Sequence, residues 1–558
     1  MGCIMMTQVI GEILKETGAI SGEQISAAMH VQEASGEVLG EILVNLNFVT
    51  KDEMASAIAS QHNLEYVDLS SYVPGQKVLE MVDKEFAIIN MVLPLKIENK
   101  NTLVVATSWP NNDEILNSLQ EMTEHKIRFV VSNPDEIGKY LQLYYEQIEY
   151  PIEQKISDMI KASVEDDEFD AIAFVDTIIN NAIKDGATDI HITPERNTSH
   201  IFFRIDGVLK HCYSIPSKMF SHIVLRIKVL GSLDIAQHIL PQNGEFDFEF
   251  LKSNYNIRVS SVPTINGEKI ALRLMPENFR LYTLENLGFE SDLVKLISDD
   301  MQKTSGIILI VGPSGSGKTT TLYAMLRKID ILSRNVISVE EPVEHQLPFV
   351  NQVQINTRAK YTFDRALHHI GRQDPDVIAI GEILDEETAK LAIRNSATGH
   401  LILSTISGSS AVRAIARIKD LNVDKYLLAD GLLSVVSQRL VRRLCNECKK
   451  EIEISKEELI KYFSESREKI LELSEDSVKI YEPQGCEHCK NSGYAGRIGV
   501  VELFRVDKVI RDMIEKNESS AKIQHYMNSI GGEDIRANGL KKLLDGLTSI
   551  QEIERIID

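Results

Sequence analysis

Apolar residues recur in the C-terminal half of the chain in a pattern that alternates strand-like and helical segments. Residues 305–311 form a β-branched apolar run, and helical spacing follows from residue 318. The runs at 335–344, 377–382 and 398–405 have the same strand-like character. Repeated strand–helix units of this kind predict a parallel sheet covered by helices.

Two further α/β domains are predicted before this one, which gives a multidomain α/β protein. We expect an N-terminal domain at 1–145, a linker at 146–170, a second α/β domain at 171–281 and a third domain at 282–558 that ends in a helical tail. The linker is acidic and weakly patterned, although some of it has helical character. The expected strands lie at 92–97, 102–106, 126–131, 189–193, 201–204, 245–250, 255–259 and 269–274, and the expected helices at 112–123, 134–144, 172–187 and 216–230.

The N-terminal domain begins with an internal repeat. The segment IGEIL at 10–14 recurs 29 residues later as LGEIL at 39–43, and Gln32 and Gln61 keep the same spacing. Each copy has the pattern of a short helix, a turn and a second amphipathic helix. We therefore expect residues 7–65 to pack as a small helical module.

The charge balance constrains the partners of the chain. Lys and Arg number 60 against 82 Asp and Glu, so the formal net charge is −22 at pH 7. An acidic surface repels nucleic acid and anionic membranes, and an aromatic content of 6% disfavours a base-stacking channel. No apolar run is long enough to span a bilayer, and the first residues lack a signal-peptide pattern. We expect a cytoplasmic protein with no nucleic-acid partner.

Residues 312–319, GPSGSGKT, match the phosphate-binding pattern G-x-x-x-x-G-K-[ST] between a strand and a helix. Glycines let backbone N–H groups converge on phosphate oxygens, and the helix N-terminus adds partial positive charge. The Lys318 ammonium can reach the β- and γ-phosphates, and the Thr319 hydroxyl is a natural Mg²⁺ ligand. A nucleoside triphosphate site in a RecA-like core is therefore predicted. Its expected binding residues are Gly312, Pro313, Ser314, Gly315, Ser316, Gly317, Lys318, Thr319 and Thr320.

Two carboxylates follow strand-like runs downstream of this loop. Glu344 ends the segment 335–344, and Glu382 ends the apolar strand at 377–382. A strand that ends in an acid beside a P-loop is the Walker B arrangement, in which the acid positions Mg²⁺ or its water shell. A single acid is often only a solvated surface charge, but the order and placement of these two favour a role in the site. His400 stands at the start of the next strand.

Four of the six cysteines form two C-x₂-C pairs, Cys445 with Cys448 and Cys486 with Cys489. Each pair presents two thiolates to one metal, so the pattern predicts a structural Cys₄ zinc site. The alternative is two redox-active or incidental thiol pairs. Because 37 residues separate the pairs, a small subdomain must fold between them. We place this zinc-binding insert at 440–497.

Taken in order, these motifs resemble the secretion ATPase superfamily, in the branch of type II secretion and type IV pilus assembly ATPases. The resemblance covers nearly the whole chain. It rests on ATDIHI at 187–192, FRIDGV at 203–208, IRVS at 257–260, VPT at 262–264, GEK at 267–269, GPSGSGKTTTLYA at 312–324, SVEEPVE at 338–344, RQDPDVIAIGEI at 372–383, ATGHLILST at 397–405 and GYAGR at 493–497.

The resemblance implies a hexameric ATPase that uses ATP, Mg²⁺ and Zn²⁺. Its PAS-like second domain, N2, and its RecA-like C-terminal domain would close over ATP at subunit interfaces. That motion would drive insertion of pilin or pseudopilin subunits into a filament. The implied partners are an inner-membrane assembly platform protein and its cytoplasmic adaptor, which would hold the protein at the membrane.

Residue roles follow from motif position in the same resemblance. Lys318 and Thr319 would serve phosphate and magnesium. Glu344 would be the water-activating base, and Glu382 the Walker B acid. The remaining implied nucleotide contacts are Arg204 at the γ-phosphate, Arg365 and Arg372 between the family's Asp box and Walker B, and His400 of the His box.

Several positions depart from the family pattern. The usual GEIRD continues with Leu384 in place of arginine, the second His-box histidine is Ser407, and a usual arginine is His368. The basic PQDGR segment ends here in Glu245. Each change removes a donor near phosphate or an interface. An alternative function is therefore a nucleotide-binding regulatory or scaffold paralogue with little hydrolysis.

The N-terminal repeat resembles the cyclic-di-GMP-binding module of some family members. In the binders an arginine precedes the LG pair, whereas this chain has Val9 and Val38. Because guanidinium groups suit guanine edges and phosphates, their loss disfavours cyclic-di-GMP binding. The alternative is a module that docks on the assembly platform.

Overall fold

The computed structural model describes residues 10–17, 19–46, 48–69, 72, 74–149, 151–165, 169–251, 253–276, 282–473, 476–486, 488–530, 532 and 534–557. The chain divides into two compact units, unit 1 at Met1–Arg280 and unit 2 at Leu281–Asp558. No helix in the described part of the chain is both long and apolar enough to cross a membrane.

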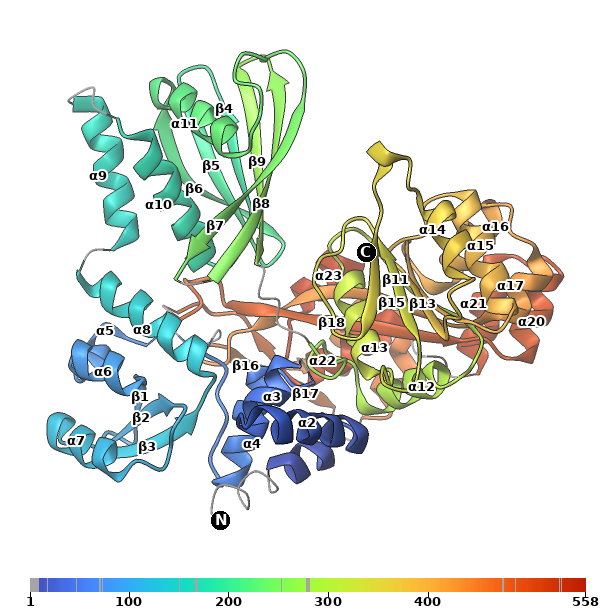
Figure 1. The fold of residues 1–558 in the computed structure, drawn as a ribbon, viewed down its shortest axis with the longest axis horizontal. Coiled ribbons are helices and arrows are strands. Elements are labelled where there is room, and N and C mark those ends of the chain that lie inside the picture. The colour runs from blue at the N-terminus through green and yellow to red at the C-terminus, as the bar shows by residue number, and fades with distance from the viewer. Residues whose placement is uncertain are drawn as a thin grey trace. The chain divides into compact units, whose positions relative to one another are not determined.

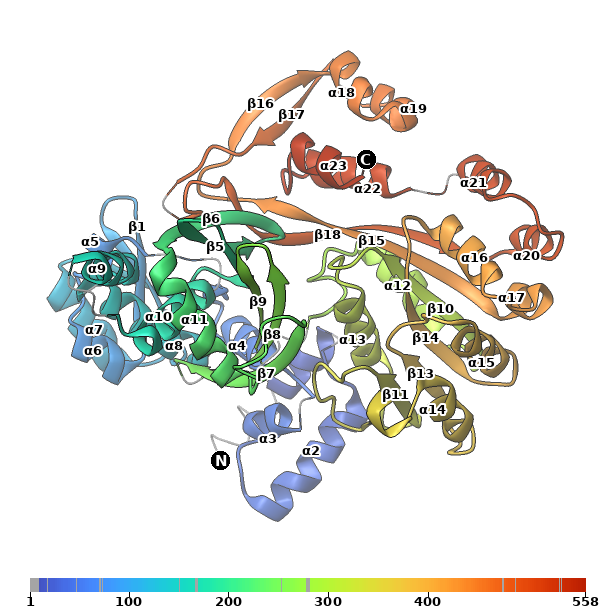
Figure 2. The ribbon, with the colours of Figure 1, turned by 90° about the horizontal axis from the view of Figure 1, so that it is seen from above.

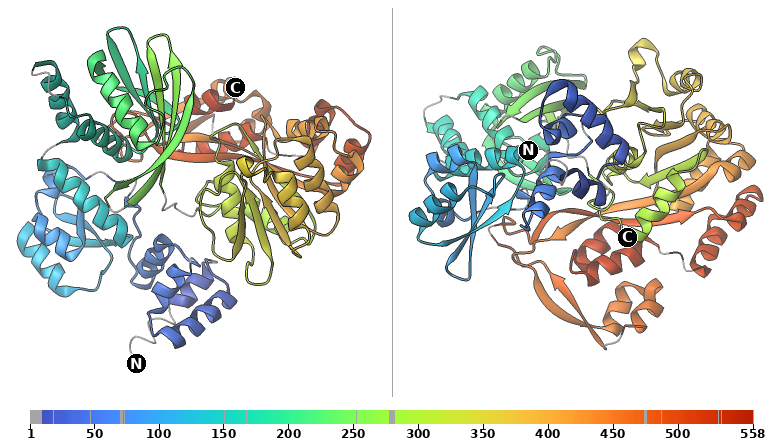
Figure 3. Two further views of the ribbon diagram at one scale, coloured as in Figure 1. Left: turned by 45° about the horizontal axis from the view of Figure 1, so that its top comes forward. Right: turned by 60° about the horizontal axis from the view of Figure 1, so that its bottom comes forward.

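The first part of unit 1 is a small helical bundle (Figure 3). Ser21 and Thr50, 29 residues apart, each close a capping box at a helix start. Leu14, Leu39 and Leu43 form part of its buried core. The helical units predicted from the repeat are therefore present, while Val9 lies outside the described residues. The elements are a helical segment at 10–16, α2 (Gly22–Ser35), α3 (Leu39–Asn45) and α4 (Lys51–Gln61).

A three-stranded sheet follows in unit 1, in the order β1-β2-β3. β1 and β2 are antiparallel, whereas β2 and β3 are parallel, so the crossover helix α7 joins the last two. The stretch predicted as a linker holds all of α9, whose Ile156 is fully buried in the core of unit 1. The elements are α5 (Gln76–Leu79), α6 (Lys84–Asn90), β1 (Val92–Glu98), β2 (Thr102–Thr107), α7 (Asp113–Thr123), β3 (Lys126–Val131), α8 (Pro134–Glu149) and α9 (Ile152–Glu165).

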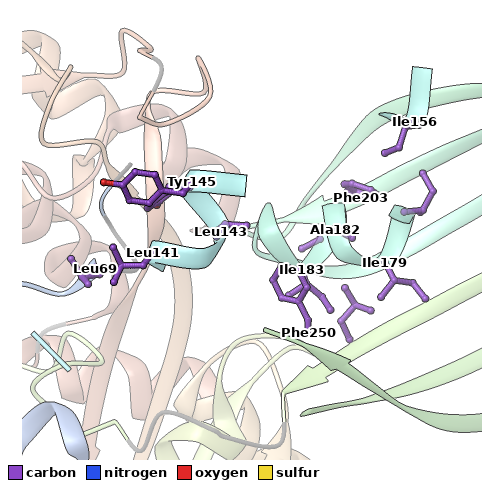
Figure 4. Close-up of a cluster of buried hydrophobic side chains, with 14 of the residues drawn as sticks. Leu69, Leu141, Leu143, Tyr145, Ile156, Ile179, Ala182, Ile183, Phe203 and Phe250 are labelled. Carbon is purple, nitrogen blue, oxygen red and sulfur yellow. The ribbon is translucent and has the colours of Figure 1, made fainter. Parts of the chain in front are cut away.

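The last part of unit 1 is a six-stranded antiparallel sheet in the order β6-β5-β4-β9-β8-β7. Two helices, α10 and α11, pack on one face (Figure 1), and Figure 4 draws Ile179 and Ile183 of α10 with Phe203 of β5 in the buried cluster. The five strands predicted here are confirmed, but β6 was not predicted. The elements are α10 (Ala171–Lys184), β4 (Ala187–Pro194), β5 (Thr198–Ile205), β6 (Val208–Pro216), α11 (Ser217–Leu230), β7 (Gln242–Phe250), β8 (Ser253–Thr264) and β9 (Gly267–Pro276).

Unit 2 is built on a seven-stranded sheet in the order β12-β11-β13-β14-β10-β15-β18. All neighbours are parallel except β15 and β18, the two long strands that run side by side in Figure 2. The predicted parallel sheet is confirmed. Its elements are α12 (Ser291–Met301), β10 (Gly306–Gly312), α13 (Lys318–Lys328), β11 (Val336–Glu340), β12 (Val350–Gln354), α14 (Phe363–Ile370), β13 (Val377–Ile380), α15 (Glu386–Ala397), β14 (Leu401–Ser407), α16 (Ala411–Asp420), α17 (Lys425–Gly431), β15 (Leu432–Leu444) and β18 (Tyr494–Arg505).

A hairpin, β16 with β17, is inserted between the two long strands. It packs with the C-terminal helices around a separate core that includes Phe463, Ile480 and Leu543. Glu552, 1% exposed, accepts hydrogen bonds from Arg442 and Arg555 and so ties the last helix to β15. The remaining elements are β16 (Lys450–Ser455), α18 (Lys456–Tyr462), α19 (Arg467–Leu471), β17 (Ser477–Glu482), α20 (Lys508–Glu515), α21 (Ser520–Ser529), α22 (Ile535–Leu544) and α23 (Ile550–Ile557).

Candidate functional site

The P-loop connects the fully buried strand β10 to helix α13. Gly312 is required by packing, because a Cβ there would lie 2.2 Å from Ser316 Oγ and 2.8 Å from the carbonyl oxygen of Gln438. Gly317 has φ of 86°, a left-handed conformation that suits glycine at the start of the helix. The loop therefore folds tightly, with backbone N–H groups and the positive end of α13 available to an anion.

Lys318 is the first residue of α13, and its ammonium lies against the loop. Nζ donates to the carbonyl oxygens of Gly312 at 3.1 Å and Pro313 at 3.3 Å. Burial lowers the pKa of Lys318, while the nearby carboxylate of Glu382 opposes that shift. The next residue, Thr319, is exposed at the same helix end. An ammonium, a carboxylate and a hydroxyl therefore occupy one edge of the sheet.

Glu382 follows strand β13 and is held there by the neighbouring strand β14. Thr405 Oγ1 donates to the carbonyl oxygen of Gly381 at 2.7 Å, and the N–H of Ile383 donates to the carbonyl oxygen of Thr405 at 2.9 Å. The Ser407 hydroxyl donates to Glu382 Oε1 at 2.6 Å. Ser407, the position at which the family pattern predicts a histidine, therefore contacts Glu382 directly.

Two glutamates at the end of β11 differ in their surroundings. Glu340 is 3% exposed and accepts hydrogen bonds from Tyr323, Ser338 and Gln352. Glu344 lies in the loop that follows the strand and is half-buried. Since β11, β13 and β14 are parallel to β10, this loop, Glu382 and the P-loop leave the sheet at the same edge.

Sequence reasoning missed the contribution of β15 to the P-loop. Gln438, 4% exposed, donates from Nε2 to the carbonyl oxygen of Ser316 at 2.6 Å and accepts from Thr321 Oγ1 at 2.7 Å. The guanidinium of Arg439 donates to the carbonyl oxygens of Gln438 and Ser409. The signal in the sequence was the polar pair Gln438–Arg439 inside the apolar run of β15.

Two of the predicted contacts, His400 and Arg372, lie at the opposite edge of the sheet from Lys318, and the third, Arg365, stays a prediction. His400 precedes β14, where its carbonyl oxygen accepts from the N–H of Gly306 at the opposite edge of the sheet. The length of β14 separates that edge from the P-loop by about 20 Å. Arg372 is exposed in the turn before β13, also at that edge. Arg365, exposed at the start of α14, donates to the carbonyl oxygen of Lys360.

Arg204 lies in unit 1, on β5. Its NH1 donates to the carbonyl oxygen of Gly207 at 3.0 Å, and its Nε is 3.9 Å from Asp189 Oδ2. The other carboxylate oxygen of Asp189 accepts from Arg273 Nε at 3.0 Å. The strand register puts Arg204 and Arg273 on the two neighbours of β4, directly across from Asp189. Two guanidinium groups thus share one acid.

The four cysteines converge at the base of the β16–β17 hairpin, with all four sulfurs within 4.8 Å of one another. The sulfur–sulfur distances include 3.7 Å for Cys448–Cys489 and for Cys486–Cys489, and 3.9 Å for Cys445–Cys486. Ligands 2.3 Å from a tetrahedral zinc lie about 3.8 Å apart, so this spacing suits that metal. Burial disfavours the Cys489 thiolate, but N–H groups of Cys486 and Gly493 bond to it and lower its pKa to about 7.

Residues 164–555 match the family described as Type II/IV secretion system protein. The chain belongs to this family. Residues 62–150 match the MshEN domain, a range that begins in the last residues of the helical repeat at 7–65 and continues beyond it. The family membership fits a P-loop sheet whose acids lie at its carboxyl edge.

Individual relatives extend the match to most of the chain. It is 30% identical over 566 residues to the type IV pilus assembly ATPase PilB of Myxococcus xanthus, covering 98% of both chains. It is 39% identical over 391 residues to the type II secretion system protein E of Aeromonas hydrophila, covering 70% of this chain and 76% of that protein. The X-ray structure of the Legionella pneumophila ATPase DotB has 17% identity and a TM-score of 0.49, covering 69% of this chain and 95% of that one.

Proposed function

We propose that this chain hydrolyses ATP to power type IV pilus assembly or type II secretion. The observation that carries the proposal is the shared edge of the unit 2 sheet, where the P-loop, Lys318 and Glu382 meet. Family membership and the pilus and secretion relatives agree with it.

The residue roles are assigned from motif position, and the geometry around Lys318 and Glu382 supports theirs. The loop N–H groups and Lys318 would hold the β- and γ-phosphates, and the Thr319 hydroxyl with Glu382 would hold Mg²⁺ and its water. Glu344 would accept the proton of the attacking water. Magnesium, when bound, would neutralise charge on the phosphate oxygens. Arg204 would reach the γ-phosphate when domains close, because a planar guanidinium matches phosphate oxygens.

The cysteine quartet is proposed to hold a structural zinc ion. Four sulfurs at tetrahedral spacing and N–H groups that stabilise a thiolate support this assignment. The metal would fix the base of the hairpin where β15 ends and β18 begins.

A homo-hexamer is proposed as the working form, located at the cytoplasmic side of the inner membrane through an assembly platform protein and its adaptor. Mixing Arg204→Ala with Lys318→Ala subunits tests the ring. If Arg204 acts across a subunit boundary, mixed rings regain part of the phosphate release that each variant alone lacks. An active, concentration-independent monomer would refute the ring.

The helical repeat is proposed as a docking module. Val38 is half exposed at the start of α3 and offers no guanidinium to a guanine base or phosphate, which argues against cyclic-di-GMP. Calorimetric titration of the protein with cyclic-di-GMP tests this: no heat of binding supports the docking role, and stoichiometric binding contradicts it.

The alternative function is a nucleotide-binding scaffold with little hydrolysis. Three substitutions favour it. Ser407 and His368 stand at positions where the family has basic side chains, and Leu384, which is 56% exposed, offers no guanidinium. Replacing the chromosomal gene by a Lys318→Ala or Glu344→Gln allele separates the two. A motor loses surface pili or secreted protein with both alleles, whereas a scaffold keeps them with Glu344→Gln, which should still bind ATP.

A further inference from the structure

Tyr323 connects the P-loop helix to the loop that carries Glu344. It lies on α13 and is 2% exposed. Its hydroxyl donates to Glu340 Oε2 at 2.5 Å and accepts from the N–H of His345 at 3.3 Å. The buried phenol therefore binds the backbone amide that directly follows Glu344.

The partner of the phenol is itself held rigidly. Glu340 Oε1 accepts from Ser338 Oγ at 2.6 Å and from Gln352 Nε2 at 3.3 Å. Gln352 Nε2 donates to the carbonyl oxygen of His345 at 2.9 Å as well. Both backbone groups of His345 are thus hydrogen-bonded, the N–H to Tyr323 and the C=O to Gln352. Each of these two side chains also bonds to Glu340.

The chemistry of the phenol suits this double role. Burial, together with the Glu340 carboxylate, raises the pKa of Tyr323, so the hydroxyl keeps the proton that it donates. The His345 ring packs edge-on against the Tyr323 ring, with centroids 5.9 Å apart. Burial lowers the pKa of His345 to about 4, so this ring is neutral and adds no charge beside the carboxylate.

We propose that Tyr323 is a positioning residue that fixes the backbone of Glu344 relative to the P-loop helix. The proposal rests on the proposed role of Glu344 as the base. Helix α13 begins at Lys318, so one rigid element would set both the phosphate and, through Tyr323, the group that activates water. A displacement of about 1 Å in such a group can cost about 100-fold in rate.

The test compares Tyr323→Phe with Tyr526→Phe in the full-length protein. Tyr526, on α21, donates a 2.6 Å bond to Asp507, so the control removes a similar bond far from the P-loop in sequence. We expect Tyr323→Phe to lower kcat about 10- to 100-fold with ATP affinity unchanged, and Tyr526→Phe to leave kcat unchanged. Equal kcat in both variants would overturn the proposal.

A double variant separates positioning from a general structural effect. If Tyr323 acts through Glu344, adding Tyr323→Phe to Glu344→Gln lowers kcat no further than Glu344→Gln alone. Multiplying losses would instead mean that Tyr323 acts elsewhere. Hydrogen exchange of the His345 amide, whose N–H bonds to Tyr323, does not depend on turnover and should be faster in Tyr323→Phe. Exchange that is unchanged in Tyr323→Phe overturns the proposal. If the wild-type protein does not hydrolyse ATP but exchange is still faster in Tyr323→Phe, only the proposed function is refuted.

Discussion

The hydroxyl of Ser407 donates a 2.6 Å hydrogen bond to Oε1 of Glu382, at the end of two adjacent parallel strands. The chain thus places a small donor at the position where the resemblance of its motifs predicts a histidine. Hydrogen-bond partners of metal-site carboxylates orient them, and their loss commonly costs 10- to 100-fold in activity or affinity.

Ser407→Ala should therefore lower ATP turnover about tenfold while leaving nucleotide affinity nearly unchanged. Steady-state phosphate release and titration with a fluorescent nucleotide measure the two quantities. Ser298→Ala, which removes a 2.7 Å bond to a carbonyl oxygen within α12, is the matched control. Turnover equal to wild type in Ser407→Ala would show that Glu382 needs no such partner.

Zinc should be present at one atom per chain and be lost in Cys448→Ser. Because a structural metal is bound only by the folded hairpin base, its loss should lower the midpoint of thermal unfolding by roughly 10 °C. Elemental analysis and calorimetry test both points, with Cys212→Ser in unit 1 as the control. Protein purified without chelator that contains no zinc would contradict the assignment.

Glu502→Gln should stabilise the protein at pH 8 more than at pH 5. Burial, with a smaller effect of Asp534, raises the pKa of Glu502 to about 7, against the favourable influence of Arg439. A carboxyl whose pKa is raised in the folded state binds its proton more tightly there, so stability falls as pH rises from about 4.5 to 7. The uncharged amide avoids this loss, which amounts to at most about 3 kcal/mol.

Thermal unfolding of both proteins across this pH range provides the measurement. A stability difference that does not grow with pH would mean that the folded protein does not hold the proton of Glu502.

Glu552→Gln should have the opposite pH dependence. Burial opposes the charge of Glu552, but bonds from Arg555 and Arg442 lower its pKa to about 2. Its stabilising effect is complete above about pH 4.5 and is lost as pH falls towards 2, so the variant should lose roughly 3 kcal/mol near pH 7 and little near pH 2. Denaturant unfolding measures this against Glu554→Gln, an exposed neighbour. Equal stability of both variants at pH 7 would contradict it.

Local patterns predicted much of the fold and of the site. The P-loop, the strand that ends at Glu382 and the two cysteine pairs are each contained in a few consecutive residues. The edge strand β6 was missed because VLKHCYSIP, largely solvent-exposed, lacks a clear alternation of apolar and polar residues. Helix α9 was obscured by its acidic surroundings.

Contacts between residues far apart in the sequence could not be predicted. Gln438 is 122 residues from Ser316, and Ser407 is 25 residues from Glu382, so only the sheet order brings each pair together. The same order separates His400 from Lys318, since a strand runs from one edge of the sheet to the other.

Steady-state phosphate release by the purified protein tests the central claim most directly. The account predicts Mg²⁺-dependent hydrolysis of ATP that falls by at least about 100-fold in Lys318→Ala and Glu382→Gln, because catalysis depends on positioned charge at phosphate and metal. Phosphate release that is unchanged in Lys318→Ala would contradict it.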